Sequence, residues 1–216
     1  MTFDFTPLTL PLLSILGALC VGAMSPGPSF IMVVRVSVAA SRRDGLAAAL
    51  GMGFGGLLFA ALALAGLQAL LMQVGWLYLV LKALGGAYLI YLGVLIWRGA
   101  AQPLATQTAS PTVRGWRRSL ALGFATQVSN PKTAIYYASV FAAFLPQHPS
   151  AALFWILPPL IFAIETGWYA LVATAFSAAL PRAAYLRCKI WIDRLAGAVL
   201  GLLGGKLMIE ALRAKA

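Results

Sequence analysis

Acidic residues, histidine and cysteine are all scarce in this 216-residue chain, which has five Asp and Glu, one His and two Cys. The histidine, His148, lies in a short polar turn, and Cys20 and Cys188 are far apart. We therefore expect neither a metal site nor a Ser/His/acid catalytic set. The glycine-rich run at 51–56 lacks the Lys-Ser/Thr ending of a Walker loop. The sequence predicts no enzyme, no cofactor and no direct use of ATP.

Apolar residues, in contrast, are abundant. The chain is 62% hydrophobic and only 10% charged, and its mean hydropathy is +0.90. A soluble domain is about 45–50% apolar and about 25% charged. The composition therefore predicts an integral membrane protein whose first partner is the lipid bilayer. The net charge of +11 comes from basic residues in short loops between apolar stretches, which favours the positive-inside rule over nucleic-acid binding.

A membrane-spanning helix needs about 20 apolar residues. We expect an all-α membrane protein with six such spans, at about 10–35, 46–73, 76–97, 119–145, 151–179 and 194–212. The start of the chain lacks the positive region of a cleaved signal peptide, so the first span should be retained. The polar stretch between the third and fourth spans divides the chain into a first three-helix repeat (1–98), a polar linker (99–118) and a second three-helix repeat (119–216).

Basic residues predict the orientation of these spans. They gather in the first, third and fifth loops, namely at Arg35, Arg42, Arg43, Arg98, Arg114, Arg117, Arg118, Arg182, Arg187, Lys189 and Arg194. The N-terminal segment and the turns after spans two and four have none. The odd loops are therefore predicted to be cytoplasmic, which places both termini outside a bacterial inner membrane. The basic C-terminal residues argue mildly against this orientation.

An internal repeat supports the division into halves. Residues 84–93 and 195–204 are identical at six of ten positions when aligned with an offset of 111. Because each half has three spans, the second copy would be inverted relative to the first, as in many secondary transporters. Small residues spaced four apart, at 47–55 and 197–205, suit close helix packing within one chain, and the alternative is a homo-oligomer seam.

Two of the predicted spans are interrupted by proline. Ser25-Pro26-Gly27-Pro28 breaks the first span, and Asn130-Pro131-Lys132 breaks the fourth. Proline removes a backbone donor and clashes with the preceding turn, and such a break survives in lipid only where it is buried in protein or lines a water-filled cavity. We expect broken helices 1 and 4 to meet near the bilayer midplane and form a binding site. The alternative is a structural kink without a ligand.

The half-helix that follows the first break would point free N–H groups into the cavity, which suits a carboxylate. Ser25 would either cap that half-helix or contact the ligand. Gln127 and Tyr136 are candidate wall residues, whereas Tyr137 is as readily explained by packing. The predicted substrate-binding set is Ser25, Pro26, Gly27, Pro28, Ser29, Gln127, Asn130, Pro131, Lys132 and Tyr136.

Two charged residues lie deep within predicted spans, Lys132 and Glu165. An ionisable residue there costs about 2.5–3.5 kcal/mol on insertion scales and indicates function by default. We expect Lys132 and Glu165 to pair, or to pair alternately, across the cavity. Glu165 would then couple export to proton entry, or Lys132 would bind a substrate carboxylate. The alternative is an ion pair that only holds two helices together.

Several of these motifs occur together in one known family. They are Ser25–Pro28 with Arg35 downstream, Arg42-Arg43-x-Gly45, the third-span run from Leu81 to Gly93, and Gly123-Phe124 followed by Asn130-Pro131-Lys132 and Leu145-Pro146-Gln147. With them the chain resembles the LysE/RhtB family of amino-acid exporters over nearly all of its length. The resemblance implies export of amino acids or close derivatives from the cytoplasm, driven by the proton gradient, another coupling ion or the membrane potential.

The chain departs from that family at two positions. Ser29 stands where a typical member has Asn, and Gly56 stands where many members have a polar or acidic residue. In the repeat alignment Gly56 lies opposite Glu165, so one half of an acidic pair is absent. This favours neutral over cationic amino acids.

The sequence thus predicts a secondary active exporter of amino acids that works by alternating access. One alternative is an exporter of a metal ion or another small metabolite on the same architecture. The other is a membrane scaffold that transports nothing.

Overall fold

The computed structural model describes residues 6–73, 77–102, 115–146 and 148–213, and within these ranges every regular element is a helix. This confirms the all-α prediction. The eight helices of the described residues are α1 (Thr6–Met24), α2 (Pro28–Ala39), α3 (Arg42–Gln73), α4 (Leu77–Gly99), α5 (Trp116–Val128), α6 (Pro131–Phe144), α7 (Ala151–Phe176) and α8 (Ala179–Arg213).

Four of these helices contain a stretch long and apolar enough to cross a membrane, and α1 with α2 makes a fifth span if the pair, bent by 57°, is one broken crossing. The protein is therefore a membrane protein, as its composition predicts. The remaining predicted span falls on α5 and α6, which have 13 and 14 residues. Each is too short to cross a bilayer alone, so the arrangement of six spans as two inverted repeats stays a prediction.

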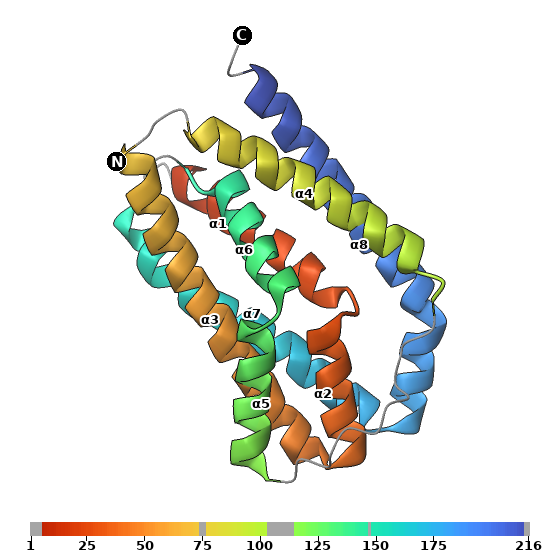
Figure 1. The fold of residues 1–216 in the computed structure, drawn as a ribbon. Coiled ribbons are helices and arrows are strands. Elements are labelled where there is room, and N and C mark those ends of the chain that lie inside the picture. The colour runs from red at the N-terminus through yellow and green to blue at the C-terminus, as the bar shows by residue number, and fades with distance from the viewer. Residues whose placement is uncertain (1–5, 74–76, 103–114, 147, 214–216) are drawn as a thin grey trace.

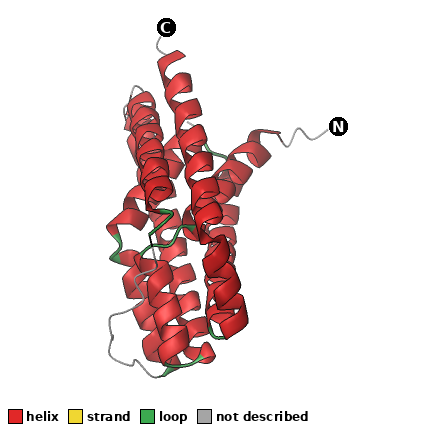
Figure 2. Ribbon diagram, turned by 90° about the vertical axis from the view of Figure 1, so that its right-hand side faces the viewer, coloured by secondary structure: helices red, strands yellow, loops and turns green. Residues whose placement is uncertain are grey.

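The helices form an elongated bundle, and α2–α3, α6–α7 and α7–α8 are connected at its ends (Figures 1 and 2). In the view of Figure 1, α2 meets α3 and α7 meets α8 at the lower end, where α5 also begins, whereas α4 ends at mid-height on the right. Arg42 and Arg117 lie in the first turns of α3 and α5 at this end, and Arg98 lies in the last turn of α4. The first turn of α1 and the last turn of α8 lie toward the upper end. The predicted turn at 74–75 and most of the predicted linker lie outside the described residues.

Glycines allow the helices to approach closely at two crossings. The antiparallel helices α4 and α8 pack along one flank, where a Cβ on Gly93 would lie 2.6 Å from the carbonyl oxygen of Gly197. On α3, a Cβ on Gly51 would overlap the carbonyl oxygen of Leu120 in α5, and one on Gly55 would lie 2.7 Å from Gln127. The small residues of α3 therefore serve packing within the chain, and this packing sets the position of Gln127.

The start of α5 is fixed by a carboxylate from α3. Asp44 Oδ1 accepts hydrogen bonds from the Gly115 N–H and from Ser119 Oγ, both at 3.0 Å. Gly115 precedes the helix with φ of 110°, a conformation that favours glycine. The two halves of the chain are thus joined at the lower end of the bundle.

Two separate apolar clusters form the core. The upper cluster includes Tyr137, Phe141 and Leu157 and draws on α1, α3, α4, α6, α7 and α8. The lower cluster includes Phe30 and Phe176 and is formed by α2, α3 and α7. The two breaks lie between these clusters, at mid-height of the bundle (Figure 1).

The close crossing of α3 and α5 predicts that Gly51→Ala destabilises the protein. Overpacking costs about 1–3 kcal/mol, so the apparent Tm in detergent should fall by about 3–10 °C. The matched control is Gly167→Ala in α7, where a Cβ would have nothing within 4 Å. This control should keep or raise the Tm, because alanine favours helix. Equal effects of the two substitutions would contradict the packing described above.

Candidate functional site

At the first break, proline starts a helix and does not interrupt one. Gly27 is the N-cap of α2, with an extended backbone (φ −138°, ψ −169°), and Pro28 is the first helical residue. At this position the missing N–H of proline has no energetic cost, because the N–H of the first helical residue has no hydrogen-bond partner within the helix. The N-cap residue is a glycine and makes no side-chain cap hydrogen bond, and the two predicted roles of Ser25 stay predictions.

The second break has the same design. Pro131 is the first residue of α6, and Asn130 is its N-cap, whose Oδ1 accepts a hydrogen bond of 3.1 Å from the Lys132 N–H. Capping by Asn is among the most favourable choices at a helix start. Each break therefore leaves a well-formed half-helix that begins at mid-height of the bundle.

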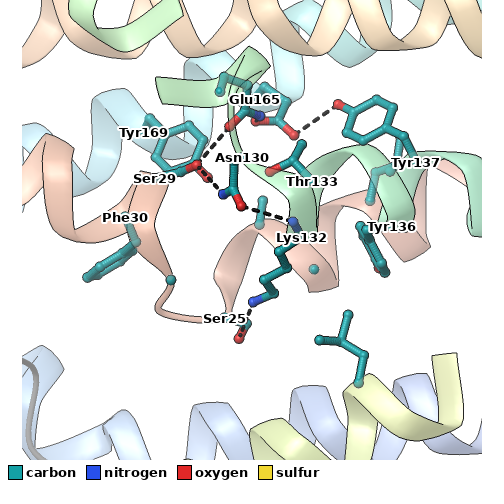
Figure 3. Close-up of a pocket in the computed structure, with 16 residues that line it drawn as sticks. Ser25, Ser29, Phe30, Asn130, Lys132, Thr133, Tyr136, Tyr137, Glu165 and Tyr169 are labelled. Carbon is teal, nitrogen blue, oxygen red and sulfur yellow. Dashed lines mark hydrogen bonds between the residues drawn. The ribbon is translucent and has the colours of Figure 1, made fainter. Parts of the chain in front are cut away.

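The two breaks meet, and a chain of buried hydrogen bonds joins them (Figure 3). Asn130 Nδ2 donates to Ser29 Oγ at 3.1 Å, and Ser29 Oγ donates to Gln127 Oε1 at 2.9 Å. Gln127 Nε2 then donates to Glu165 Oε2 at 3.0 Å. The other carboxylate oxygen, Oε1, accepts from the Tyr137 hydroxyl at 3.0 Å. All five side chains are buried.

Lys132 lies at the opposite end of this group from Glu165 (Figure 3). Its ammonium group donates one long hydrogen bond, 3.4 Å, to Ser25 Oγ. No ion pair joins Lys132 to Glu165 among the described residues. The predicted pairing is therefore not formed in this conformation, because neutral donors satisfy the carboxylate and the first break holds the ammonium group.

A small cavity lies among these residues. Its volume is about 40 Å³, and its lining includes Ser25, Gly27, Ser29, Gln127, Asn130, Lys132, Tyr136 and Glu165. Seven of the ten predicted binding residues thus line one cavity, together with the predicted coupling residue Glu165. Pro26, Pro28 and Pro131 do not line it, and their role is to shape the breaks. Pockets for small molecules measure about 300–1,000 Å³, so the cavity is too small to hold an amino acid in this conformation.

Tyr136 closes the cavity on the side of α1. Its ring occupies the space that a Cβ on Gly22 would need, and its hydroxyl donates to the carbonyl oxygen of Ala18. This hydrogen bond ties α6 to α1 beside the first break.

Gly56 lies directly beside Glu165. A Cβ on Gly56 would be 2.8 Å from the Tyr137 hydroxyl and 3.1 Å from Cγ of Glu165. The repeat alignment matches Gly56 with Glu165, and the structure places the two in contact. The space that a second acidic residue would need is filled by the hydrogen-bonded pair of Tyr137 and Glu165.

A larger, apolar pocket lies on the other side of Tyr137. It measures about 400 Å³ and is lined by residues of α3, α4 and α6, among them Phe59, Leu62 and Phe141. Tyr137 is the residue shared with the polar cavity. Leu62 is 58% exposed, so the apolar pocket is open at the surface of the bundle, and Tyr137 lines both this pocket and the polar cavity.

One tyrosine and one ion pair could not be identified as candidates from the sequence. The sequence explains Tyr137 by packing as readily as by a role in the site, although Tyr137 contacts Glu165. Lys189 and Asp193 form a buried ion pair of 2.8 Å in α8, where the sequence predicted a loop. Their spacing of four residues, which places opposite charges on one helix face, is a signal that could have identified them.

Comparisons with known proteins agree with one another. The sequence profile of the family described as LysE type translocator matches residues 20–211. Threonine efflux proteins of Salmonella typhimurium (strain LT2) and Escherichia coli (strain K12) are 35% and 34% identical over 192 residues, which cover 88% of this chain and 93% of each relative. A leucine efflux protein of Salmonella choleraesuis (strain SC-B67) is 32% identical over 126 residues, 56% of each chain. No solved structure matches the chain significantly.

The chain of hydrogen bonds predicts that Ser29→Ala destabilises the protein. The substitution leaves Gln127 Oε1 and Asn130 Nδ2 without their shared partner, and each buried unpaired group costs about 1–3 kcal/mol. The apparent Tm should fall by about 2–10 °C. The control is Ser177→Ala at the exposed end of α7, whose hydroxyl bonds only a carbonyl of its own helix and should change stability by less than about 0.5 kcal/mol. An unchanged Tm for Ser29→Ala would show that the breaks are held by other contacts.

Proposed function

The chain belongs to the LysE type translocator family, which confirms the resemblance seen in its motifs, and from this premise we propose that it is a secondary exporter of amino acids that works by alternating access. It acts in the bacterial inner membrane and carries neutral amino acids or close derivatives out of the cytoplasm. The names of its threonine and leucine efflux relatives support this class of substrate.

The cavity supplies groups that suit a substrate carboxylate. The first turns of α2 and α6 both contribute residues to its wall, among them Ser29, Phe30 and Thr133. N–H groups of a first turn have no partner within the helix and carry the positive end of the helix dipole. Lys132 adds a full positive charge beside them. The proposal rests above all on this convergence of two half-helix starts and one lysine in a single buried cavity.

Alternating access requires a gate on each side of the site. The lower cluster separates the cavity from the end that carries the basic helix termini, and the upper cluster separates it from the other end. With the basic end in the cytoplasm, both chain termini lie outside. A cavity of about 40 Å³ is too small for substrate, and each substrate-accessible state would open one cluster.

Neutral side chains suit the surroundings of the cavity better than cationic ones. Glu165 is already bonded by Gln127 and Tyr137, and Gly56 leaves no second carboxylate beside it. The adjoining apolar pocket offers room for an aliphatic side chain once Tyr137 moves. The geometry therefore favours substrates such as threonine or leucine over lysine.

An efflux assay tests this function. Cells lacking their own exporters are loaded with dipeptides of alanine, threonine, leucine or lysine, and the free amino acids in the medium are measured. The intact protein should accelerate efflux of at least one neutral amino acid. Lys132→Met should slow it by about 10- to 100-fold, because a hydrogen bond to a charged group contributes about 1.5–3 kcal/mol.

The control for Lys132→Met is Lys206→Met, at a lysine whose side chain is 71% exposed, which should leave efflux unchanged. If no amino acid leaves faster with the protein than without it, the proposed function is wrong. If the protein is instead a membrane scaffold, Lys132→Met should lower its stability, and the intact protein itself should not accelerate efflux.

Glu165 is the proposed proton carrier, and Glu165→Gln tests that role. The amide keeps an oxygen that accepts from Tyr137 but cannot exchange a proton at physiological pH. We expect binding to persist while the dependence of efflux on the external pH disappears, measured between pH 6 and 8 in loaded vesicles. A pH dependence identical to that of the unmodified protein would reject Glu165 as the coupling residue.

A further inference from the structure

Two of the residues that line the polar cavity also belong to the lower apolar cluster. They are Phe30, in the first turn of α2, and Tyr169, in the second half of α7. Phe30 is 1% exposed and directly follows Ser29, a member of the hydrogen-bond chain. Its side chain therefore lies where the cavity meets the apolar packing that separates it from the lower end of the bundle.

Two further aromatic rings pack against Phe30 within the lower cluster. Tyr185 of α8 stacks on it, with ring centroids 5.3 Å apart and ring planes inclined by 25°. Phe176, the last residue of α7, meets Phe30 edge-on at 5.6 Å and Tyr185 at 5.1 Å. Each ring of this aromatic triad (Phe30, Phe176 and Tyr185) thus contacts both others, and aromatic pairs in such geometries attract one another beyond the effect of their burial.

The hydroxyl group of Tyr185 takes no part in this attraction. It is buried and has no hydrogen-bond partner within the described part of the chain. A buried hydroxyl without a partner disfavours the packed arrangement relative to one in which the hydroxyl reaches water. The triad is therefore held by its rings and opposed by its one polar atom, which suits a contact that forms and separates in turn.

Helix α2 can carry Phe30 away from the other two rings. It has only 12 residues, and residues 25–27, which join it to α1 at an angle of 57°, are not helical. Hinges are commonly a few residues at the ends of elements that absorb changes of φ and ψ. Because α7 and α8 are continuous helices of 26 and 35 residues, a rotation of α2 about the first break would separate Phe30 from Tyr185 and Phe176.

We propose that the aromatic triad is the gate between the substrate cavity and the lower end of the bundle. Phe30 is the ring that faces the substrate, and Tyr185 and Phe176 are positioning residues that hold Phe30 in the path. This inference rests on the proposed function and names the residues that open one of the two clusters. Phe30 leaves Tyr185 when an amino acid enters from the lower end, and packs against it again before the other side opens.

Access of a small thiol reagent to the cavity tests the gate. The reporter is Thr133→Cys, since Thr133 lines the cavity, in a full-length chain that also carries Cys20→Ser and Cys188→Ser. A membrane-impermeant methanethiosulfonate is added to inside-out and to right-side-out vesicles. A second reporter, Arg117→Cys in the exposed first turn of α5, identifies the vesicles in which the lower end faces the reagent.

Tyr185→Ala should raise the labelling rate of the Thr133→Cys reporter by about tenfold or more. The increase should occur only in the vesicles whose reagent faces the lower end. The reason is that labelling follows the population of the open gate, and loss of the Tyr185 ring shifts the equilibrium toward the open gate. If Tyr185→Ala does not fold, Tyr185→Leu, which fills much of the same volume but cannot stack, should change the rate in the same direction.

Two control variants distinguish gating from packing in general. Tyr185→Phe keeps the ring and removes only the hydroxyl, so it should be labelled at the unmodified rate, within about twofold. Phe54→Ala breaks a different ring pair, Phe54 and Phe162 at 4.9 Å, which lies outside the cavity lining. This variant should also leave the labelling rate unchanged.

The gate would be overturned if a folded Tyr185→Ala or Tyr185→Leu variant were labelled at the unmodified rate, or faster only from the face opposite the lower end. Equal acceleration by Phe54→Ala would overturn it as well, because any loss of packing would then expose the cavity. Labelling requires no transported solute. A protein that shows the expected labelling but accelerates efflux of no amino acid would therefore refute the proposed function and leave the gate in place.

Discussion

The hydrogen-bond chain from Asn130 through Ser29 and Gln127 to Glu165 is the constraint on which the rest of the structure depends. In the interior of a membrane protein each polar group needs a partner within the protein. Two interrupted helices expose backbone and side-chain groups that no lipid can satisfy. By meeting, the breaks satisfy each other, and Gln127 extends the contact to α7. The close crossing of α3 and α5 at glycine residues holds Gln127 within hydrogen-bonding distance of Glu165.

The outline of the site could be predicted from sequence because proline and glycine act locally. Pro28 and Pro131 determine where half-helices begin whatever surrounds them, and their matching positions in the two halves indicated that the breaks would meet. The hydrogen bond between Asn130 and Ser29 agrees with that expectation. The family follows from the same motifs, and the sequence profile confirms it.

The features of the site that could not be predicted from the sequence depend on which residues are neighbours in the folded protein. Lys132 and Glu165 were expected to pair because they are the deep charges of the predicted spans, but Gln127 and Tyr137 reach the carboxylate. Asp193 was missed because the sixth span was predicted to begin at 194, whereas α8 begins at Ala179 and carries Asp193 into the protein interior. In both cases long-range packing, which hydropathy does not encode, decides the partner.

The small size of the central cavity has a consequence for the order of events at the site. The space of about 40 Å³ beside the two breaks has room for only a few water molecules. A solute the size of an amino acid therefore fits only after the side chains that line the cavity have moved apart. Occupancy of the site and rearrangement of the two half-helices are thus tied to one another.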